Sequence, residues 1–133
     1  MCHIQIGTNR TKNIFIIFQE DIIIAKKVRL GIIGYGNMGI GHAENIMSGK
    51  CPEIELVAVA DIKESRRAAV KEQYGEAITV FDDAEKMMDS GLIDAVLVAV
   101  PHYDHPKYSI TAMERGIHVM CEKPAGVYAK AVR

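Results

Sequence analysis

The fold of this chain of 133 residues is decided by one stretch, Val28-Arg29-Leu30-Gly31-Ile32-Ile33-Gly34-Tyr35-Gly36-Asn37-Met38-Gly39. Its first part is a mostly apolar run, which predicts a buried strand over 28–33. Glycines follow directly in the spacing G-x-G-x-x-G. Gly34 permits a sharp turn, and Gly39 allows the next helix to pack close to the strand. We therefore expect a strand, a tight turn and a helix over about 38–47.

Short apolar runs and helical patterns alternate along the rest of the chain. Strands are predicted at 56–60, 78–80, 95–100 and 117–121, and helices at 61–74, from Asp82 or Asp83 to Met88, from Pro106 to about Arg115, and from about Val127. The strands are continuously apolar, which indicates a sheet covered by helices on both faces. A helix between each pair of strands indicates parallel pairing through right-handed crossovers. The predicted fold is an α/β doubly wound parallel sheet in the order 3-2-1-4-5, forming a single three-layer αβα domain.

The glycine spacing also predicts a phosphate site. Gly36 has no side chain to block a pyrophosphate, and the N-terminus of the following helix offers unpaired N–H groups and a positive dipole end. The pattern alone is weak, because an ordinary tight turn needs glycines too. Its position between a strand and a helix is the context that dinucleotide binding requires. The cofactor-binding residues predicted here are Gly34, Tyr35, Gly36, Asn37, Met38 and Gly39.

Asp61 follows the second predicted strand, about 20 residues after the glycines, where a carboxylate accepts hydrogen bonds from the adenosine ribose hydroxyls. With Glu64 it also fits a capping box at the start of the next helix, and the two roles are compatible. A carboxylate here repels a 2′-phosphate, which favours NAD over NADP. Arg66 and Arg67 could hold such a phosphate, but their place about 1.5 turns into the helix predicts solvated surface charges. NAD is therefore the predicted cofactor, with NADP as the alternative.

Composition excludes several classes of protein. Hydrophobic residues make up 49% and charged residues 25% of the chain, as in ordinary soluble domains, and the net charge is −1. This balance gives no electrostatic footprint for nucleic acid or anionic lipid. Cys2, Cys51 and Cys121 are odd in number and lack the spacing of metal ligands. We expect reduced thiols, a cytoplasmic protein, and neither a metal site nor a membrane or nucleic-acid partner.

The start of the chain is set apart by two apolar runs, Ile14–Phe18 and Ile22–Ile24, which polar and acidic residues at 19–21 separate. Neither run approaches the roughly 20 apolar residues of a transmembrane helix. A signal peptide would have one unbroken apolar block, and a targeting role is the alternative to a plain extension. We expect an N-terminal extension of unknown role over 1–27, whose first apolar run could cover a sheet edge, and a dinucleotide-binding domain over 28–133.

From Lys27 to the C-terminus the chain resembles one family, the Gfo/Idh/MocA oxidoreductases related to glucose-fructose oxidoreductase and inositol dehydrogenase. Four stretches carry the resemblance: the glycine turn 34–39 with His42, Val57-Ala58-Val59-Ala60-Asp61, Pro101-His102-Tyr103-Asp104-His105, and Gly116-Ile117-His118-Val119-Met120-Cys121-Glu122-Lys123-Pro124. The last is the most specific, because Glu-Lys-Pro after the fifth strand is a signature of the family. The resemblance implies a Rossmann fold, a nicotinamide cofactor, and hydride transfer between NAD(P) and a sugar, polyol or related hydroxy compound.

Lys123 is the catalytic residue that the resemblance implies. In the family this lysine reaches the nicotinamide and the substrate, where its ammonium can hydrogen-bond the reacting oxygen and support proton transfer. The alternative from the residues alone is a loop lysine paired with Glu122. Glu122, Lys123 and Pro124 are all expected to contact the cofactor at the carboxyl edge of the sheet. The family often has a cis bond before this proline.

The loop over 101–105 follows the fourth strand at the same sheet edge, and the family places it near the nicotinamide ribose. Many members have Asn where His102 stands, so this contact departs from the family pattern. His105 matches a histidine of the family, with helix capping as the alternative. His42 and His118 are expected to pack or pair structurally. The cofactor contacts predicted from this part of the chain are Val100, Pro101, His102 and His105.

Members of the family are much longer than this chain and carry the substrate pocket in a second α/β domain. Hydride transfer needs the substrate carbon held about 3 to 3.5 Å from the nicotinamide. From its length, the chain is expected to lack the substrate domain. Without residues to hold the substrate carbon, it is expected to bind cofactor weakly and to show no turnover. A sugar or polyol becomes a partner only if that domain is supplied. A non-catalytic NAD(H)-binding regulatory or structural protein is the alternative, and homo-oligomerisation stays open.

Overall fold

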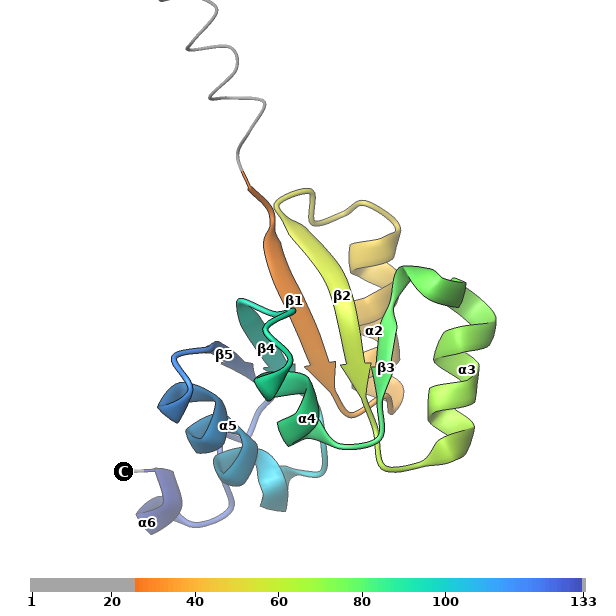
Figure 1. Cartoon of the computed structure of the whole chain (residues 1–133). Helices are drawn as coiled ribbons and strands as arrows, with labels where there is room; N and C mark the ends of the chain where they lie inside the picture. Colours follow the sequence, from red (N-terminus) through yellow and green to blue (C-terminus); the bar gives the residue numbers. More distant parts are fainter. Residues whose placement is uncertain (1–25, 133) are drawn as a thin grey trace, which may run out of the picture.

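The computed structural model describes residues 26–132, which contain a five-stranded parallel sheet in the order β3-β2-β1-β4-β5 (Figure 1). Its strands are β1 (Val28–Ile33), β2 (Ile54–Ala60), β3 (Thr79–Phe81), β4 (Ala95–Val98) and β5 (His118–Cys121). The helices are α2 (Asn37–Met47), α3 (Glu64–Tyr74), α4 (Ala84–Asp89), α5 (His105–Glu114) and α6 (Ala129–Val132), with the 3-10 turns η1 (Gly75–Ala77) and η2 (His102–Asp104). The predicted strand order and parallel pairing are confirmed. The two apolar runs of the predicted extension lie outside the described residues.

Helices cover both faces of this sheet, as the continuously apolar strands predict (Figure 1). Side chains of β1 alternate between two buried clusters: Leu30 and Ile32 pack on the side of α2 and α3, and Ile33 packs on the side of α4 and α5. The helices contribute Ala43 and Val70 to the first cluster and Met87 and Ala112 to the second. The predicted three-layer αβα arrangement is therefore confirmed. It brings the carboxyl ends of the parallel strands to one edge of the sheet.

The strand boundaries differ slightly from the predictions. β2 begins at Ile54 because it pairs with Val28 from the start of β1. The third strand lies at 79–81 rather than 78–80, and the fifth begins one residue later than expected. β4 ends at Val98 rather than at 100, because its partner Ile33 is the last residue before β1 turns away. The residues after Val98 therefore belong to the loop at the carboxyl edge.

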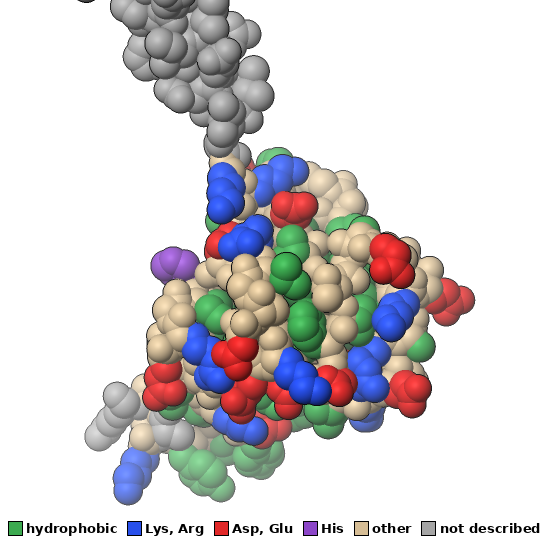
Figure 2. All heavy atoms as spheres, in the orientation of Figure 1, with side chains coloured by type: hydrophobic (Ala, Val, Ile, Leu, Met, Phe, Trp, Pro, Cys, Tyr) green, Lys and Arg blue, Asp and Glu red, His purple; other side chains and the backbone are tan. Residues whose placement is uncertain are grey.

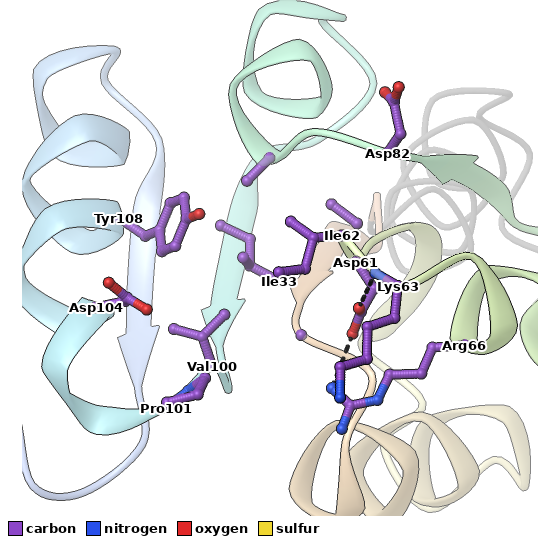
Figure 3. A pocket seen from close by; sticks show the side chains of 13 residues that line it. Ile33, Asp61, Ile62, Lys63, Arg66, Asp82, Val100, Pro101, Asp104 and Tyr108 are labelled. Carbon is purple, nitrogen blue, oxygen red and sulfur yellow. Dashed lines mark hydrogen bonds and ion pairs between the residues drawn. The ribbon is translucent and has the colours of Figure 1, made fainter.

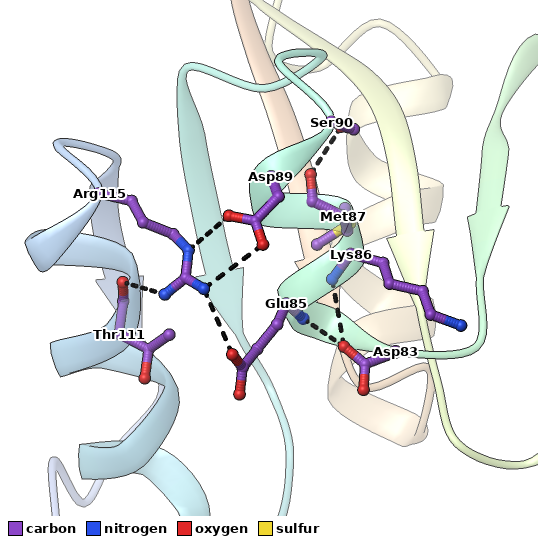
Figure 4. Close-up of polar contacts among 8 residues, drawn as sticks. All are labelled: Asp83, Glu85, Lys86, Met87, Asp89, Ser90, Thr111 and Arg115. Carbon is purple, nitrogen blue, oxygen red and sulfur yellow. Dashed lines mark hydrogen bonds and ion pairs between the residues drawn. The ribbon is translucent and has the colours of Figure 1, made fainter.

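Arg115, the residue after α5, ties that helix to α4 (Figure 4). Its guanidinium donates from Nε to Asp89 at 2.7 Å and from Nη2 to Glu85 at 3.3 Å. Asp83 caps α4 by accepting from the amides of Glu85 at 2.7 Å and Lys86 at 3.1 Å. Of the two aspartates predicted as caps, the second is the one used. These contacts fix the positions of α4 and α5 on one face of the sheet.

Acidic and basic side chains are interspersed on the face of the molecule that Figure 2 shows. No helix among residues 26–132 is long and apolar enough to cross a membrane. Within the same range, no three His, Cys, Asp or Glu side chains gather into a group that could hold a metal ion. The feature that distinguishes this part of the chain is the carboxyl edge of the sheet, where most of the predicted site residues lie.

Candidate functional site

The turn between β1 and α2 requires glycines because a side chain would collide with the backbone. Gly34 has a φ of +94°, and a Cβ there would lie 2.8 Å from the carbonyl oxygen of Ala99. A Cβ on Gly39 would lie 2.0 Å from the carbonyl oxygen of Gly34. The sharp turn and the close helix packing predicted for these two glycines are therefore confirmed.

The N-terminus of α2 carries backbone amides that have no partner within the helix. Its first internal hydrogen bond runs from the amide of Ile40 to the carbonyl of Gly36, so the amides of residues 37–39 precede the helical ladder. No side chain in the described part of the chain caps this helix. A Cβ on Gly36 would have the guanidinium of Arg66 as its nearest neighbour, at 3.7 Å. This helix end can therefore receive an anion beside a residue that has no side chain.

Asp61 is a buried carboxylate that holds the glycine turn against the end of β2. It is 6% exposed, and its Oδ2 accepts from the amide of Tyr35 at 2.7 Å. Its Oδ1 accepts from the amide of Lys63 at 2.8 Å (Figure 3). The predicted capping box is wrong, because α3 begins at Glu64 with Lys63 as its N-cap and no side chain caps it. Asp61 lies too far before the helix to cap it, and its carboxylate binds the turn instead.

The two arginines near the start of α3 reach back to Asp61 while staying partly exposed. Nη1 of Arg66 donates to Oδ2 of Asp61 at 3.3 Å (Figure 3). Nη1 of Arg67 donates to the backbone carbonyls of Asp61 at 2.9 Å and Ile62 at 2.8 Å. The prediction of solvated charges is therefore wrong in that both arginines have partners, because α3 begins at Glu64, later than expected, and both fall near its first turn; the Arg66 side chain is still 40% exposed. A cation thus stands beside the carboxylate at the end of β2.

Tyr35 contributes its backbone, and not its ring, to this edge of the sheet. The residue is 2% exposed and packs in the cluster between the sheet, α2 and α3. Its hydroxyl donates to Oε1 of Gln73 at 3.1 Å, and burial raises the pKa of the phenol. Its amide already donates to Asp61. Among the residues predicted at the glycine turn, Tyr35 is therefore a core residue.

A cleft of about 200 Å³ opens between the ends of β1 and β2 and the loop after β4 (Figure 3). Its lining includes the predicted residues Gly34, Asp61, Val100 and Pro101, and three that the sequence patterns do not reveal, Ile62, Asp104 and Tyr108. The sequence offers one indication for Ile62, because an apolar residue directly after the acid at a strand end is placed to line a cleft there. For Tyr108 there is none, because the sequence does not give the direction in which its helix turns the ring.

A second cleft, of about 210 Å³, lies between the N-terminus of α2 and the loops after β4 and β5. It is lined by predicted residues from all three segments, Met38, Val100, Pro101, His102, His105, Glu122 and Lys123. Val100 and Pro101 line both clefts, so the two clefts adjoin. The fold therefore brings together the glycine turn, the loop after β4 and the Glu-Lys-Pro segment.

Glu122 binds α2 and not the neighbouring lysine. Its Oε1 lies 2.5 Å from Nε2 of His42, and this contact is the main cause that lowers the pKa of the Glu122 carboxyl. Among residues 26–132, no ion pair joins Glu122 to Lys123, so the predicted alternative of a paired loop lysine is wrong. His42 pairs structurally, as expected. The peptide bond between Lys123 and Pro124 is cis, as the family resemblance implies.

His105 is buried between two loops, with 2% of its surface exposed. Its Nδ1 lies 2.7 Å from the carbonyl oxygen of Pro124, and its Nε2 lies 2.8 Å from that of Val100. The alternative of a helix cap is wrong, because the N-cap of α5 is Asp104 and no side-chain bond caps the helix. His118 is exposed at the start of β5, at the opposite edge of the sheet from the clefts.

Known proteins are similar to this chain in both sequence and fold. The oxidoreductase family with an NAD-binding Rossmann fold (Gfo/Idh/MocA) matches residues 28–132. The chain is 34% identical over 109 residues to inositol 2-dehydrogenase of Rubrobacter xylanophilus, a match that covers 82% of this chain and 30% of that protein. It is 36% identical over 115 residues to D-glucoside 3-dehydrogenase of Escherichia coli, covering 86% of this chain and 32% of that protein.

Solved structures agree with this assignment. Apo scyllo-inositol dehydrogenase from Lactobacillus casei matches with a TM-score of 0.75 and 31% identity, over 81% of this chain and 31% of that one. The same enzyme with bound NAD(H) and scyllo-inositol matches with a TM-score of 0.73 and 30% identity, over 80% and 31%. The chain thus spans about 30% of the length of the relatives it matches. On the match over residues 28–132, the chain belongs to the Gfo/Idh/MocA oxidoreductase family through its NAD-binding Rossmann fold.

Proposed function

We propose that this chain binds NAD along the carboxyl edge of its sheet, as the cofactor-binding part of a sugar or polyol dehydrogenase. One observation carries the proposal: the uncapped N-terminus of α2 lies beside Gly36 and close to the buried carboxylate of Asp61. The amides of residues 37–39 would bind the pyrophosphate, and the adenosine ribose hydroxyls would donate to Asp61. The nicotinamide would lie in the second cleft, beside Lys123.

Asp61 has the capacity for this role. An ionised carboxylate accepts about four hydrogen bonds. Asp61 accepts from the amides of Tyr35 and Lys63 and from the guanidinium of Arg66. The contact with Arg66 is the longest of the three, at 3.3 Å, and the Arg66 side chain is 40% exposed. A ribose hydroxyl can therefore use the remaining acceptor site or displace this arginine.

The proposed cofactor is NAD and not NADP, because the carboxylate of Asp61 is buried and bound by two amides, while the Arg66 side chain is 40% exposed and makes the longer contact. A 2′-phosphate would meet a carboxylate that two backbone amides hold in place. Arg66 opposes this preference, since it can turn its guanidinium toward a phosphate. The balance between these two residues sets the cofactor preference.

Calorimetric titration of NADH and NADPH into the purified chain tests the proposal. We expect NADH to bind more tightly than NADPH. Asp61→Asn should narrow the difference, and Arg66→Ala should weaken NADPH more than NADH. Lys71→Ala, a change of the lysine in the last turn of α3, is the matched control and should alter neither affinity. Tighter binding of NADPH by the unmutated chain would contradict the NAD preference, and binding of neither cofactor would contradict the proposed function.

Lys123 is the residue proposed to hold a proton at Nζ beside the reacting oxygen of a substrate. The bound nicotinamide would supply the hydride chemistry. We propose that the 133-residue chain binds cofactor without turning over a polyol, and its span of about 30% of the matched dehydrogenases supports this. Steady NADH formation from an inositol by the purified chain would refute it. Three expectations stay predictions: a dinucleotide-binding domain over 28–133, a cytoplasmic location, and homo-oligomerisation.

A further inference from the structure

The imidazole of His105 connects the two loops that frame the second cleft. Its Nε2 lies 2.8 Å from the carbonyl oxygen of Val100, directly before Pro101. Its Nδ1 lies 2.7 Å from the carbonyl oxygen of Pro124, directly after Lys123. Among residues 26–132, no other side chain has polar atoms within hydrogen-bond distance of both loops. The ring therefore lies between the loop after β4 and the loop after β5, and it contacts both.

The ring is held rigidly from its own side as well. His105 is the first residue of α5, a helix that packs on the sheet through the buried Ala112. The residue is 2% exposed, so the ring itself is shielded from water, and its contacts with the two carbonyls are part-buried. The connection thus runs from the packed helix through the ring to both loops.

Lys123 has no anchor of its own. Its side chain is exposed, and among the described residues it makes no hydrogen bond or ion pair. Its backbone is held from both sides: Glu122 by His42 of α2, and Pro124 by His105 of α5. Together with the amide of Glu122, which donates to the carbonyl of Val98 at 3.0 Å, these two contacts set the direction in which Lys123 enters the second cleft.

We propose that His105 is a positioning residue, which fixes Lys123 and the loop after β4 relative to each other at the nicotinamide end of the cofactor site. The role rests on the proposed function, since it assigns the second cleft to the nicotinamide. His105 makes no hydrogen bond to the glycine turn or to Asp61, which form the adenosine end. Loss of the imidazole should therefore weaken the binding of the nicotinamide half much more than that of the adenosine half, although Val100 and Pro101 also line the first cleft.

The test compares NADH with ADP-ribose, which has the adenosine half and lacks the nicotinamide. His105→Phe keeps an aromatic ring and removes both nitrogens. In calorimetric titrations we expect about tenfold weaker binding of NADH and a change of no more than about twofold for ADP-ribose. His118→Phe changes the exposed histidine at the other end of β5 and is the matched control. It should leave both affinities unchanged.

Equal losses for both ligands, or an unchanged NADH affinity in a folded His105→Phe variant, would overturn the positioning role. If circular dichroism shows that this variant does not fold, His105→Gln replaces it, because the Gln amide can still donate to one of the two carbonyls. The same selective loss for NADH, at a smaller size, is then expected, and its absence contradicts the proposal.

Amide NMR shifts of the cofactor-free chain give a second readout. His105→Phe should move the amides of Glu122 and Lys123 and leave that of Asp61 unmoved. Unmoved amides at 122–123 would contradict the positioning role whether or not a ligand binds. If the unmutated chain binds neither NADH nor ADP-ribose, the proposed function fails, and the amide shifts still decide whether His105 positions Lys123.

Discussion

The turn between β1 and α2 and the segment after β5 lie on the same sheet edge, yet different kinds of contact hold them. The turn is mainly backbone against backbone, with Gly39 packed on the carbonyl of Gly34 and the Asp61 carboxylate as the one side chain that binds it. The segment at 122–124 is held by side chains of two helices, His42 from α2 and His105 from α5. At Gly34 and Gly39 the first part has no space for a Cβ. We expect the segment at 122–124 to shift when it loses His42 or His105, while the rest of the fold is kept.

This difference separates what supports the fold from what adjusts the site. A collision at the turn would push α2 away from the sheet and disturb the buried cluster that contains Ala43. A lost contact at 122–124 would release an exposed segment at the end of an edge strand. We therefore expect changes at the turn to act mainly on stability, and changes at the segment to act mainly on cofactor binding.

Gly39→Ala should have the largest effect, because its Cβ would lie 2.0 Å from the carbonyl oxygen of Gly34. We expect a loss of about 3 kcal/mol in the free energy of unfolding, measured with urea. Gly41→Ala is the matched control: it lies in the same helix, and a Cβ there would have nothing within 4 Å. That variant should gain up to about 1 kcal/mol. Similar stabilities for the two variants would show that the backbone contact is not what limits the turn.

Asp61→Ala tests the one side chain on which the turn depends. Removing this carboxylate leaves the buried amide of Tyr35 without a partner, which should cost about 2 kcal/mol of unfolding free energy. Asp83→Ala is the control, because Asp83 also accepts from two backbone amides but is exposed. Water can reach those amides, so its loss should be about 1 kcal/mol. Equal losses would mean that burial does not decide the effect.

The strands and helices could be predicted because they depend on short-range patterns, and the sheet order followed because parallel strands joined by right-handed crossovers permit few arrangements. Continuous apolar strands, helices between them and three spaced glycines determine the layers and the turn. The prediction of a capping box at Asp61 and Glu64 was wrong because it considered only neighbours in the sequence. Asp61 finds a stronger partner in the amide of Tyr35, which is 26 residues away in the sequence. With the carboxylate bound to Tyr35, α3 begins at Glu64, and Arg66 lines the first cleft.

The candidate site could be predicted only in part, for the same reason. Strand ends place Asp61, the loop after β4 and the Glu-Lys-Pro segment at one edge, so their neighbourhood follows from the topology. The partners of Glu122 and His105 do not, since these contacts span 80 and 19 residues and depend on side-chain direction. Resemblance to a family singles out a histidine, but it does not say that both of its nitrogens face backbone carbonyls.

Glu122→Gln should have the smallest effect on stability, and that effect should depend on pH. His42 lowers the pKa of Glu122 from its ordinary value of 4.5. A carboxyl with a lowered pKa stabilises the folded state above the unfolded value, and this contribution is lost as pH falls through the folded value. The variant should therefore be less stable than the unmutated chain near neutral pH, and the difference should disappear as pH falls below 4.5.

Urea unfolding at a series of pH values measures this difference. Glu44→Gln, on the exposed side of the same helix that carries His42, is the matched control and should show no difference at either end of the series. A loss that persists unchanged in acid would show that Glu122 acts through packing and not through its charge. The segment after β5 would then be held in the same way as the turn, by fit, and the contrast between the two parts would fail.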